Sequence, residues 1–198
     1  MWTLHLWSAG KYYLGASCNL VYSLMFCSST NYIFCCRQKG HAKRVVRVDV
    51  RSGEVDMIGP EYTGEFKWLR GVEIPGHALG DTHSSGCCLA LPCNSENGCV
   101  LKIDPESSKV TTFVTGQPPN VDEGWLYHGG NLAAADNFVY AIPATASRVM
   151  RIDPREETTE YIGKEYHGKA KWYGGITGID GCIYGIPHNV SSELSESH

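Results

Sequence analysis

The chain of 198 residues is 42% hydrophobic and 19% charged, which is typical of a globular protein and excludes a largely disordered one. Its formal net charge of -4 disfavours nucleic acid and acidic membranes as partners, because both are bound through basic surfaces. The 22 glycines and 9 prolines favour short strands joined by many turns over long helices.

The first notable segment is an uncharged stretch between Lys11 and Arg37. Asparagines, serines and a threonine interrupt it, so no apolar run reaches the roughly 20 residues that a membrane span needs. The extreme N-terminus also lacks a basic region followed by an apolar core and a cleavage site. We therefore expect buried strands here, with a membrane or secretory segment as the alternative. A cytoplasmic location is favoured, and only secretion would give meaning to the glycosylation sequon at Asn189.

Further along, the chain repeats itself. Residues 45–71 and 149–175 match without a gap at a constant offset of 104 residues, and the matches include an Arg-x-Asp, a tyrosine and a Lys-Trp pair. A looser copy lies between them, at 100–113 and 125–130. The offset therefore contains two units of about 50 residues.

Each unit contains four predicted strands: a glycine-rich strand, an I-Y-x-I-P strand, a V-x-R-I-D-P strand and a T-x-x-Y-I-G strand, before a loop that ends in K-W-x-x-G. Asp49, Asp104 and Asp153 recur after the third strand, where we expect them to form turns. No segment has the pattern of an amphipathic helix. Four strands in a repeat of about 50 residues predict an all-β fold, a β-propeller with four-stranded blades, with a β-sandwich as the runner-up.

The number of blades is open between two arrangements. Four blades close into a ring in which the two ends of the chain share one blade, or the blades form an incomplete ring with exposed strand edges. The sequence favours the incomplete ring. We expect residues 1–28 to be a degenerate or unmatched N-terminal segment, 29–190 to hold the propeller repeats and 191–198 to be a polar tail.

Two strings carry a resemblance to known repeats: VMRIDPREETTEYIG at 149–163 and GGITGIDGCIYGIP at 174–187. They resemble the blades of NHL, YVTN and streptogramin-lyase-like propellers, and also uncharacterised tandem arrays of microbial eukaryotes built on K-W-x-G-G and I-Y-x-I-P. The resemblance implies an architecture. It does not imply an activity, because such families range from enzymes to interaction platforms.

A candidate ligand site lies on one rim of this architecture, because alternate loops of a four-stranded meander emerge on the same face. The rim gathers aromatic, cationic and amide side chains, namely Lys67, Trp68, Asn94, Trp125, His128, Lys171, Trp172, His188 and Asn189. Such groups suit a protein, peptide or carbohydrate ligand, by stacking and hydrogen bonding. The recurring tryptophans have a second interpretation, as packing wedges between neighbouring blades. The two lysines are expected to be solvated rather than buried.

The sequence therefore predicts a non-catalytic interaction module that presents this rim to its ligand. One alternative is a propeller-type lyase or hydrolase with a channel site that uses His128 and His188, and another is an inactive structural fragment. Asp81, His83 and Ser84 have the composition of a catalytic triad, but residues so close in sequence rarely reach its geometry. We interpret the segment 73–86 that contains them as a flexible, polar, glycine-rich loop.

Cysteines give no sign of a metal site. The chain has 9 cysteines, an odd number, without a C-x-x-C motif. In a strand, the adjacent residues of Cys35-Cys36 and Cys87-Cys88 point to opposite faces, so neither pair readily chelates one metal. We expect reduced thiols that fill the core, no metal and no other cofactor. An incomplete ring would in addition favour self-association through its strand edges.

Overall fold

The computed structural model describes the backbone of strands at 4–5, 13–14, 22–27 and 32–37, and residues 43–94, 98–114 and 125–189 with their side chains. Within these residues the fold is all-β, with one fully described helical element, the short 3-10 helix η1 (Gly76–Leu79). The predicted fold class is confirmed.

Three antiparallel sheets of four strands follow one another along the chain, and each keeps its strands in chain order. The first contains β3 (Tyr22–Cys27), β4 (Tyr32–Arg37), β5 (Val45–Asp49) and β6 (Val55–Ile58). The second contains β7 (Trp68–Ile74), β8 (Cys87–Pro92), β9 (Val100–Ile103) and β10 (Val110–Phe113). The third contains β11 (Tyr127–Leu132), β12 (Val139–Pro143), β13 (Val149–Asp153) and β14 (Thr158–Ile162).

A pair of strands, β15 (Trp172–Thr177) and β16 (Ile183–Pro187), continues the series as half of a further sheet. The first strands of successive sheets, β3, β7, β11 and β15, pack next to one another. This is the arrangement of propeller blades around an axis, with the first strand of each blade innermost. We refer to the sheets as blades 1, 2 and 3 and to β15–β16 as the half-blade.

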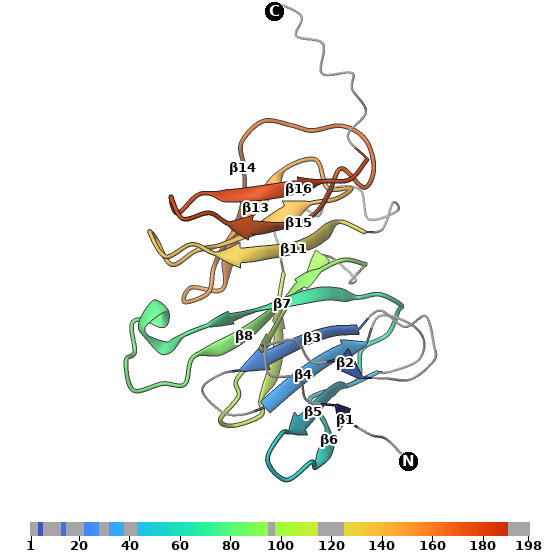
Figure 1. Ribbon diagram of the computed structural model, residues 1–198, viewed down its shortest axis with the longest axis vertical. Coiled ribbons are helices and arrows are strands. Elements are labelled where there is room, and N and C mark those ends of the chain that lie inside the picture. Colours follow the sequence, from blue (N-terminus) through green and yellow to red (C-terminus); the bar gives the residue numbers. More distant parts are fainter. Residues whose placement is uncertain are drawn as a thin grey trace, which may run out of the picture.

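The ring of blades is open. The N-terminal strands β1 (Leu4–His5) and β2 (Tyr13–Leu14) pair only with each other, and β16 has no partner besides β15 among the described strands. Figure 1 shows β1 and β2 at the same end of the molecule as β6, and the half-blade at the opposite end. Of the two predicted arrangements, the structure therefore has the incomplete ring. Blade 1 begins at Tyr22, while the predicted domain limits at 28/29 and 190/191 stay predictions.

Apolar side chains fill the two junctions between complete blades. Residues from blades 1 and 2, among them Val45, Trp68 and Leu101, form one buried cluster, and residues from blades 2 and 3 form another around Leu91 and Met150. Cys87 belongs to the second cluster and its neighbour Cys88 to the first, because adjacent strand residues point to opposite faces. Both side chains are buried. The blades are thus held together mainly by burial of apolar surface.

The recurring aspartates form turns, as predicted. Oδ1 of Asp49 accepts backbone hydrogen bonds from the second and third residues after it, at 2.8 and 3.3 Å. Asp104 and Asp153 repeat the same pair of bonds. In Asp49, the bonds from the backbone N–H groups of Arg51 and Ser52 lower the pKa of the carboxyl group.

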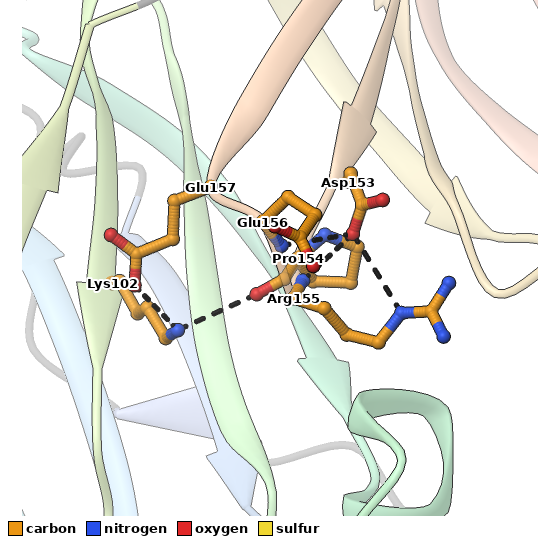
Figure 2. Close-up of polar contacts among 6 residues, drawn as sticks. All are labelled: Lys102, Asp153, Pro154, Arg155, Glu156 and Glu157. Carbon is orange, nitrogen blue, oxygen red and sulfur yellow. Dashed lines mark hydrogen bonds and ion pairs between the residues drawn. The ribbon is translucent and has the colours of Figure 1, made fainter.

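Polar bonds also join blade 1 to blade 2 and blade 2 to blade 3, and each starts from the residue two positions before the turn aspartate. Arg47 of blade 1 donates a hydrogen bond to Ser108 Oγ in a turn of blade 2, at 2.6 Å. Lys102 of blade 2 reaches the equivalent turn of blade 3, where its Nζ lies 2.7 Å from Glu157 Oε1 and 3.4 Å from the carbonyl oxygen of Pro154 (Figure 2). We call these bonds the blade clasps.

Candidate functional site

The innermost strands share one register, and this register defines the rim position by position. Trp68, Tyr127 and Trp172 each face the proline that ends the second strand of their own blade, and a bulge follows each of them. Tyr127 is therefore the counterpart of the two tryptophans in blade 3. Equating Trp125 with Trp68 and Trp172 was wrong, because Trp125 lies two residues before Tyr127, which has their place in the register; Trp125 corresponds to Phe66.

The wedge interpretation describes the tryptophan position well. Trp68 is 5% exposed, and its Nε1 donates a hydrogen bond to the carbonyl oxygen of Cys99 at 2.8 Å. Its ring meets the Tyr62 ring edge to face, with centroids 4.9 Å apart. Trp172 repeats this contact with Tyr166 at 4.8 Å. Each of these tryptophans packs against the loop that precedes its own strand. Trp68 in particular has little exposed surface left for a ligand.

The two rim lysines are buried, which differs from the solvated state expected for them. Lys171 is 4% exposed, and its ammonium group donates hydrogen bonds to the carbonyl oxygens of Ala144, Ala146 and Gly168 at 2.9 to 3.0 Å. Lys67 is 8% exposed and donates to the equivalent carbonyl oxygen, that of Gly64, at 2.8 Å. Backbone carbonyl groups replace the water around each ammonium group, so burial is tolerated. The two lysines therefore stabilise the loops that precede blade 2 and the half-blade.

The rim asparagines have different surroundings. The side-chain oxygen of Asn94 accepts a hydrogen bond from the backbone N–H of Trp125, and so links the end of β8 to the start of blade 3. Asn189 is exposed, and its backbone N–H bonds to Ala170. Asn94 therefore positions Trp125, whereas the Asn189 side chain is open to solvent.

A row of rings crosses the rim from blade 2 to the half-blade. Phe66 and Trp125 have centroids 5.3 Å apart, and Trp125 stacks on His128 at 5.8 Å. His128 contacts Tyr173 at 3.8 Å, and Tyr173 contacts His188 at 5.6 Å. We call these five residues the aromatic strip. Trp125, His128 and His188 were predicted site residues, whereas Phe66 and Tyr173 were missed; the aromatic residue that follows the K-W pair at 171–172 was the available signal.

His128 is the most unusual member of the strip. It is 7% exposed, and its Nδ1 is buried without a hydrogen-bond partner among the described residues. Burial in the first place, and then the charges of Arg70 and His188, lower its pKa to about 4. The imidazole is therefore neutral at pH 7.

The two histidines do not form an acid–base pair in this arrangement. His188 Nδ1 lies 3.2 Å from the carbonyl oxygen of Ala170, and Nδ1 of His128 is unpartnered. Both imidazoles instead contact the Tyr173 ring. Within the residues described, no ion pair links either of them to a carboxylate, the acidic neighbour that the lyase or hydrolase alternative requires.

The segment at 73–86 does not assemble a triad either. The fully solvated His83 lies 3.9 Å from Asp81, and Ser84 Oγ accepts a hydrogen bond from Gly86 instead of facing His83. The segment contains η1 and packs closely: a Cβ added at Gly76 would lie 2.1 Å from the carbonyl oxygen of Ser84. It is a compact turn on the opposite rim rather than the flexible loop expected from its composition.

In the part of the chain with described side chains, no three His, Cys, Asp or Glu residues lie together as ligands for a metal ion. None of the described helical segments is long and apolar enough to cross a membrane.

No protein-family model matches the chain, and no curated protein matches it by sequence. Solved structures share its fold at low identity. Hydrazine synthase from Kuenenia stuttgartiensis is 15% identical, with a TM-score of 0.57 over 92% of this chain and 47% of that one. Two proteins from Bacteroides thetaiotaomicron also match. One, of unknown function, is 14% identical with a TM-score of 0.58 over 88% of this chain and 40% of that one. The other, an auxiliary nutrient binding protein, is 15% identical with a TM-score of 0.53 over 83% and 35%.

The chain thus has a β-propeller-like fold and spans less than half the length of these three structures. At such identities the likeness concerns the fold alone. The resemblance to NHL, YVTN and streptogramin-lyase-like repeats is supported at the level of the propeller architecture, and no named family is matched.

Proposed function

We propose that the chain is a non-catalytic binding module whose ligand, a protein, peptide or carbohydrate, lies across the aromatic strip. The observation that carries this proposal is the unbroken series of ring contacts from Phe66 to His188. Within it, Trp125 is 40% and Tyr173 45% exposed. Partly open aromatic faces offer a large apolar contact area at a small cost in conformational entropy, which is why binding surfaces use them.

The other predicted rim residues support this role by fixing the strip in place. Asn94 holds the backbone of Trp125, and Lys171 holds the loop that leads into Trp172 and Tyr173. The ligand therefore meets a surface that is already organised before binding, and pre-organisation improves affinity. A nutrient-binding protein among the structures of similar fold agrees with a binding role.

The proposal is tested with arrays of immobilised peptides and oligosaccharides, probed with the full chain and with the Trp125→Ala and Tyr173→Ala variants. Each substitution removes an exposed face of the strip, and we expect each to weaken every specific signal at least ten-fold. Tyr184→Ala is the matched control, because Tyr184 is also on the half-blade and 51% exposed but bonds to Asp180 at the opposite rim. Unchanged signals from both strip variants, with native circular dichroism, would contradict the proposal.

A further inference from the structure

Arg70 occupies a backbone position at which the other two fully described innermost strands have glycine. Its φ is 59°, while the φ values of its counterparts, Gly129 and Gly174, are 109° and 80°. This left-handed region is unfavourable for any residue that has a Cβ atom. The other blades show that glycine can fill this position without strain. A strained arginine in its place therefore suggests a role in function.

The side chain of Arg70 extends from blade 2 across blade 3 toward the half-blade. A Cβ atom added at Gly129 would lie 2.8 Å from Arg70 Cδ, and one added at Gly174 would lie 3.3 Å from Arg70 Nη1. The two glycines thus leave the space through which Arg70 passes. The guanidinium group is consequently placed beside the half of the strip formed by His128 and Tyr173.

Two polar groups in this region lack partners among the described residues, and Arg70 is close enough to His128 for its charge to lower the pKa of the imidazole. Arg70 is exposed and makes no hydrogen bond or ion pair with any residue described by the structure. Nδ1 of His128 is buried and likewise unpartnered. An unsatisfied nitrogen in a side chain that is more than nine-tenths buried is rare in proteins and calls for an explanation, and a bound ligand is one.

We propose that Arg70 and the Nδ1 of His128 bind the carboxylate group of a ring-bearing ligand whose flat body stacks on the aromatic strip. This inference rests on the proposed function and names the chemical class that the strip selects. A guanidinium group presents two parallel N–H donors that match the two oxygens of a carboxylate. The neutral imidazole of His128 donates a further hydrogen bond when its proton is on Nδ1.

A carboxylate suits this site better than a phosphate group because, among the described residues, Arg70 is the one Lys or Arg whose charge acts on His128. Lys67 and Lys171, the nearest lysines along the rim, direct their ammonium groups to backbone carbonyl oxygens. A phosphate monoester carries close to two negative charges, and one guanidinium group balances only one of them. The single charge of Arg70 therefore matches a monoanion.

The test uses benzoate as the probe and benzamide as its neutral counterpart of the same shape. The full chain is titrated with each, and the imidazole resonances of His128 and the indole resonance of Trp125 are followed by NMR. We expect both probes to shift the indole signal, and benzoate to bind at least ten-fold more tightly than benzamide, because charged hydrogen bonds are stronger than neutral ones. Only benzoate should shift the His128 resonances strongly.

Three variants separate the carboxylate contact from the fold. Arg70→Gly installs the residue found in the other blades, so it should fold at least as stably and bind benzoate no better than benzamide. Gly129→Ala places a Cβ against Arg70 and should reduce the benzoate preference at least five-fold. Gly163→Ala is its control, because Gly163 also has a positive φ, of 74°, but nothing lies within 4 Å of an added Cβ.

The outcomes distinguish this inference from the proposed function. If benzoate and benzamide bind equally to the unmodified chain, or if Arg70→Gly leaves the benzoate preference intact, the carboxylate site is overturned while the strip stands. Tighter binding of inorganic phosphate than of benzoate also overturns it. If neither probe shifts the Trp125 signal, the strip itself fails as a binding surface, and the inference fails with it.

Discussion

At the scale of the residue, the chemistry of the site depends on His128, whose charged form is unfavourable in the folded chain. Arg70 from β7 and His188 after β16 add positive charge to a ring that burial already desolvates, while the Tyr173 ring packs against it from β15. The pKa of about 4 lies below the ordinary value near 6.5. Between these values the unfolded chain binds a proton that the folded chain excludes.

This difference in pKa predicts how stability depends on pH. As the pH falls from about 6.5 toward 4, protonation of the unfolded state should lower the free energy of unfolding by up to about 1.4 kcal/mol per pH unit. Above pH 6.5 the contribution of His128 is constant. His128→Phe keeps a ring in the strip and removes the titration, so its loss of stability over this range should be smaller.

Urea unfolding followed by circular dichroism at a series of pH values measures this effect. His167→Phe is the control, because it removes an exposed histidine. Parallel stability profiles for the unmodified chain and His128→Phe between pH 6.5 and 4 would show that His128 is not desolvated as the structure has it.

Sequence patterns predicted the residues of the rim better than their roles. Trp125 and His128 do lie on the predicted face, but matching by residue type paired Trp125 with Trp68 and Trp172, whereas Tyr127, two residues later, has their place in the register. The burial of Lys67 and Lys171 was missed for a related reason. Composition describes lysine as a surface residue, while here the loop itself folds back and supplies the carbonyl groups.

At the scale of the element, the turns and strands were predictable because they depend on local chemistry that the repeat shows more than once. Asp49, Asp104 and Asp153 cap equivalent turns with the same pair of bonds. The order of strands within each blade follows from these turns and from chain connectivity. Contacts between blades, such as the ring contacts of the strip, join residues distant in sequence and leave no periodic signal.

The loop before the half-blade allows a prediction about the buried lysines. Lys171→Met keeps the length and apolar stem of the side chain but leaves the carbonyl oxygens of Ala144, Ala146 and Gly168 without their charged donor. Hydrogen bonds that involve a charged group stabilise a fold more than neutral ones. We expect the substitution to lower the free energy of unfolding by about 2 to 3 kcal/mol.

Chemical unfolding measures this loss, with Lys109→Met, at an exposed lysine, as the control that should change stability by less than about 0.5 kcal/mol. Blade 3 has Leu126 at the position of Lys171, which shows that a blade can also start without this cation. If Lys171→Met were as stable as the unmodified chain, apolar packing alone would hold the loop. The hydrogen bonds of the ammonium group would then make no net contribution to the free energy of unfolding.

At the scale of the whole molecule, the clasps join successive complete blades. Arg47 and Lys102 each bond to a turn of the following blade. Arg151 has the equivalent place in blade 3, but the turn that it would reach in a complete fourth blade is not among the described residues. Its Nη2 pairs with Glu160 within blade 3, and its Nε is buried without a partner there. Nε of Arg151 is thus positioned to donate a hydrogen bond to the equivalent turn of a further blade.

The half-blade leaves apolar surface open that complete blades cover. Ile176 and Ile186 are 58% and 41% exposed, while their counterparts in blade 2, Val72 and Leu91, are 8% and 0% exposed. The second strand of a complete blade is paired on both sides, whereas β16 is paired only with β15 in the described fold. An apolar strand with a free edge is a template for pairing with another chain.

We therefore expect copies of the chain to associate through β16, and sedimentation velocity over a range of concentrations to show a mass that rises with concentration. Replacing both Ile176 and Ile186 by lysine places charges beside the open edge and should keep the chain monomeric, because charged side chains block edge pairing. Thr112→Lys, on the outer strand of complete blade 2, is the control and should associate like the unmodified chain. A monomer at every concentration would mean that the free edge is protected, and association that survives the double substitution would assign it to another surface.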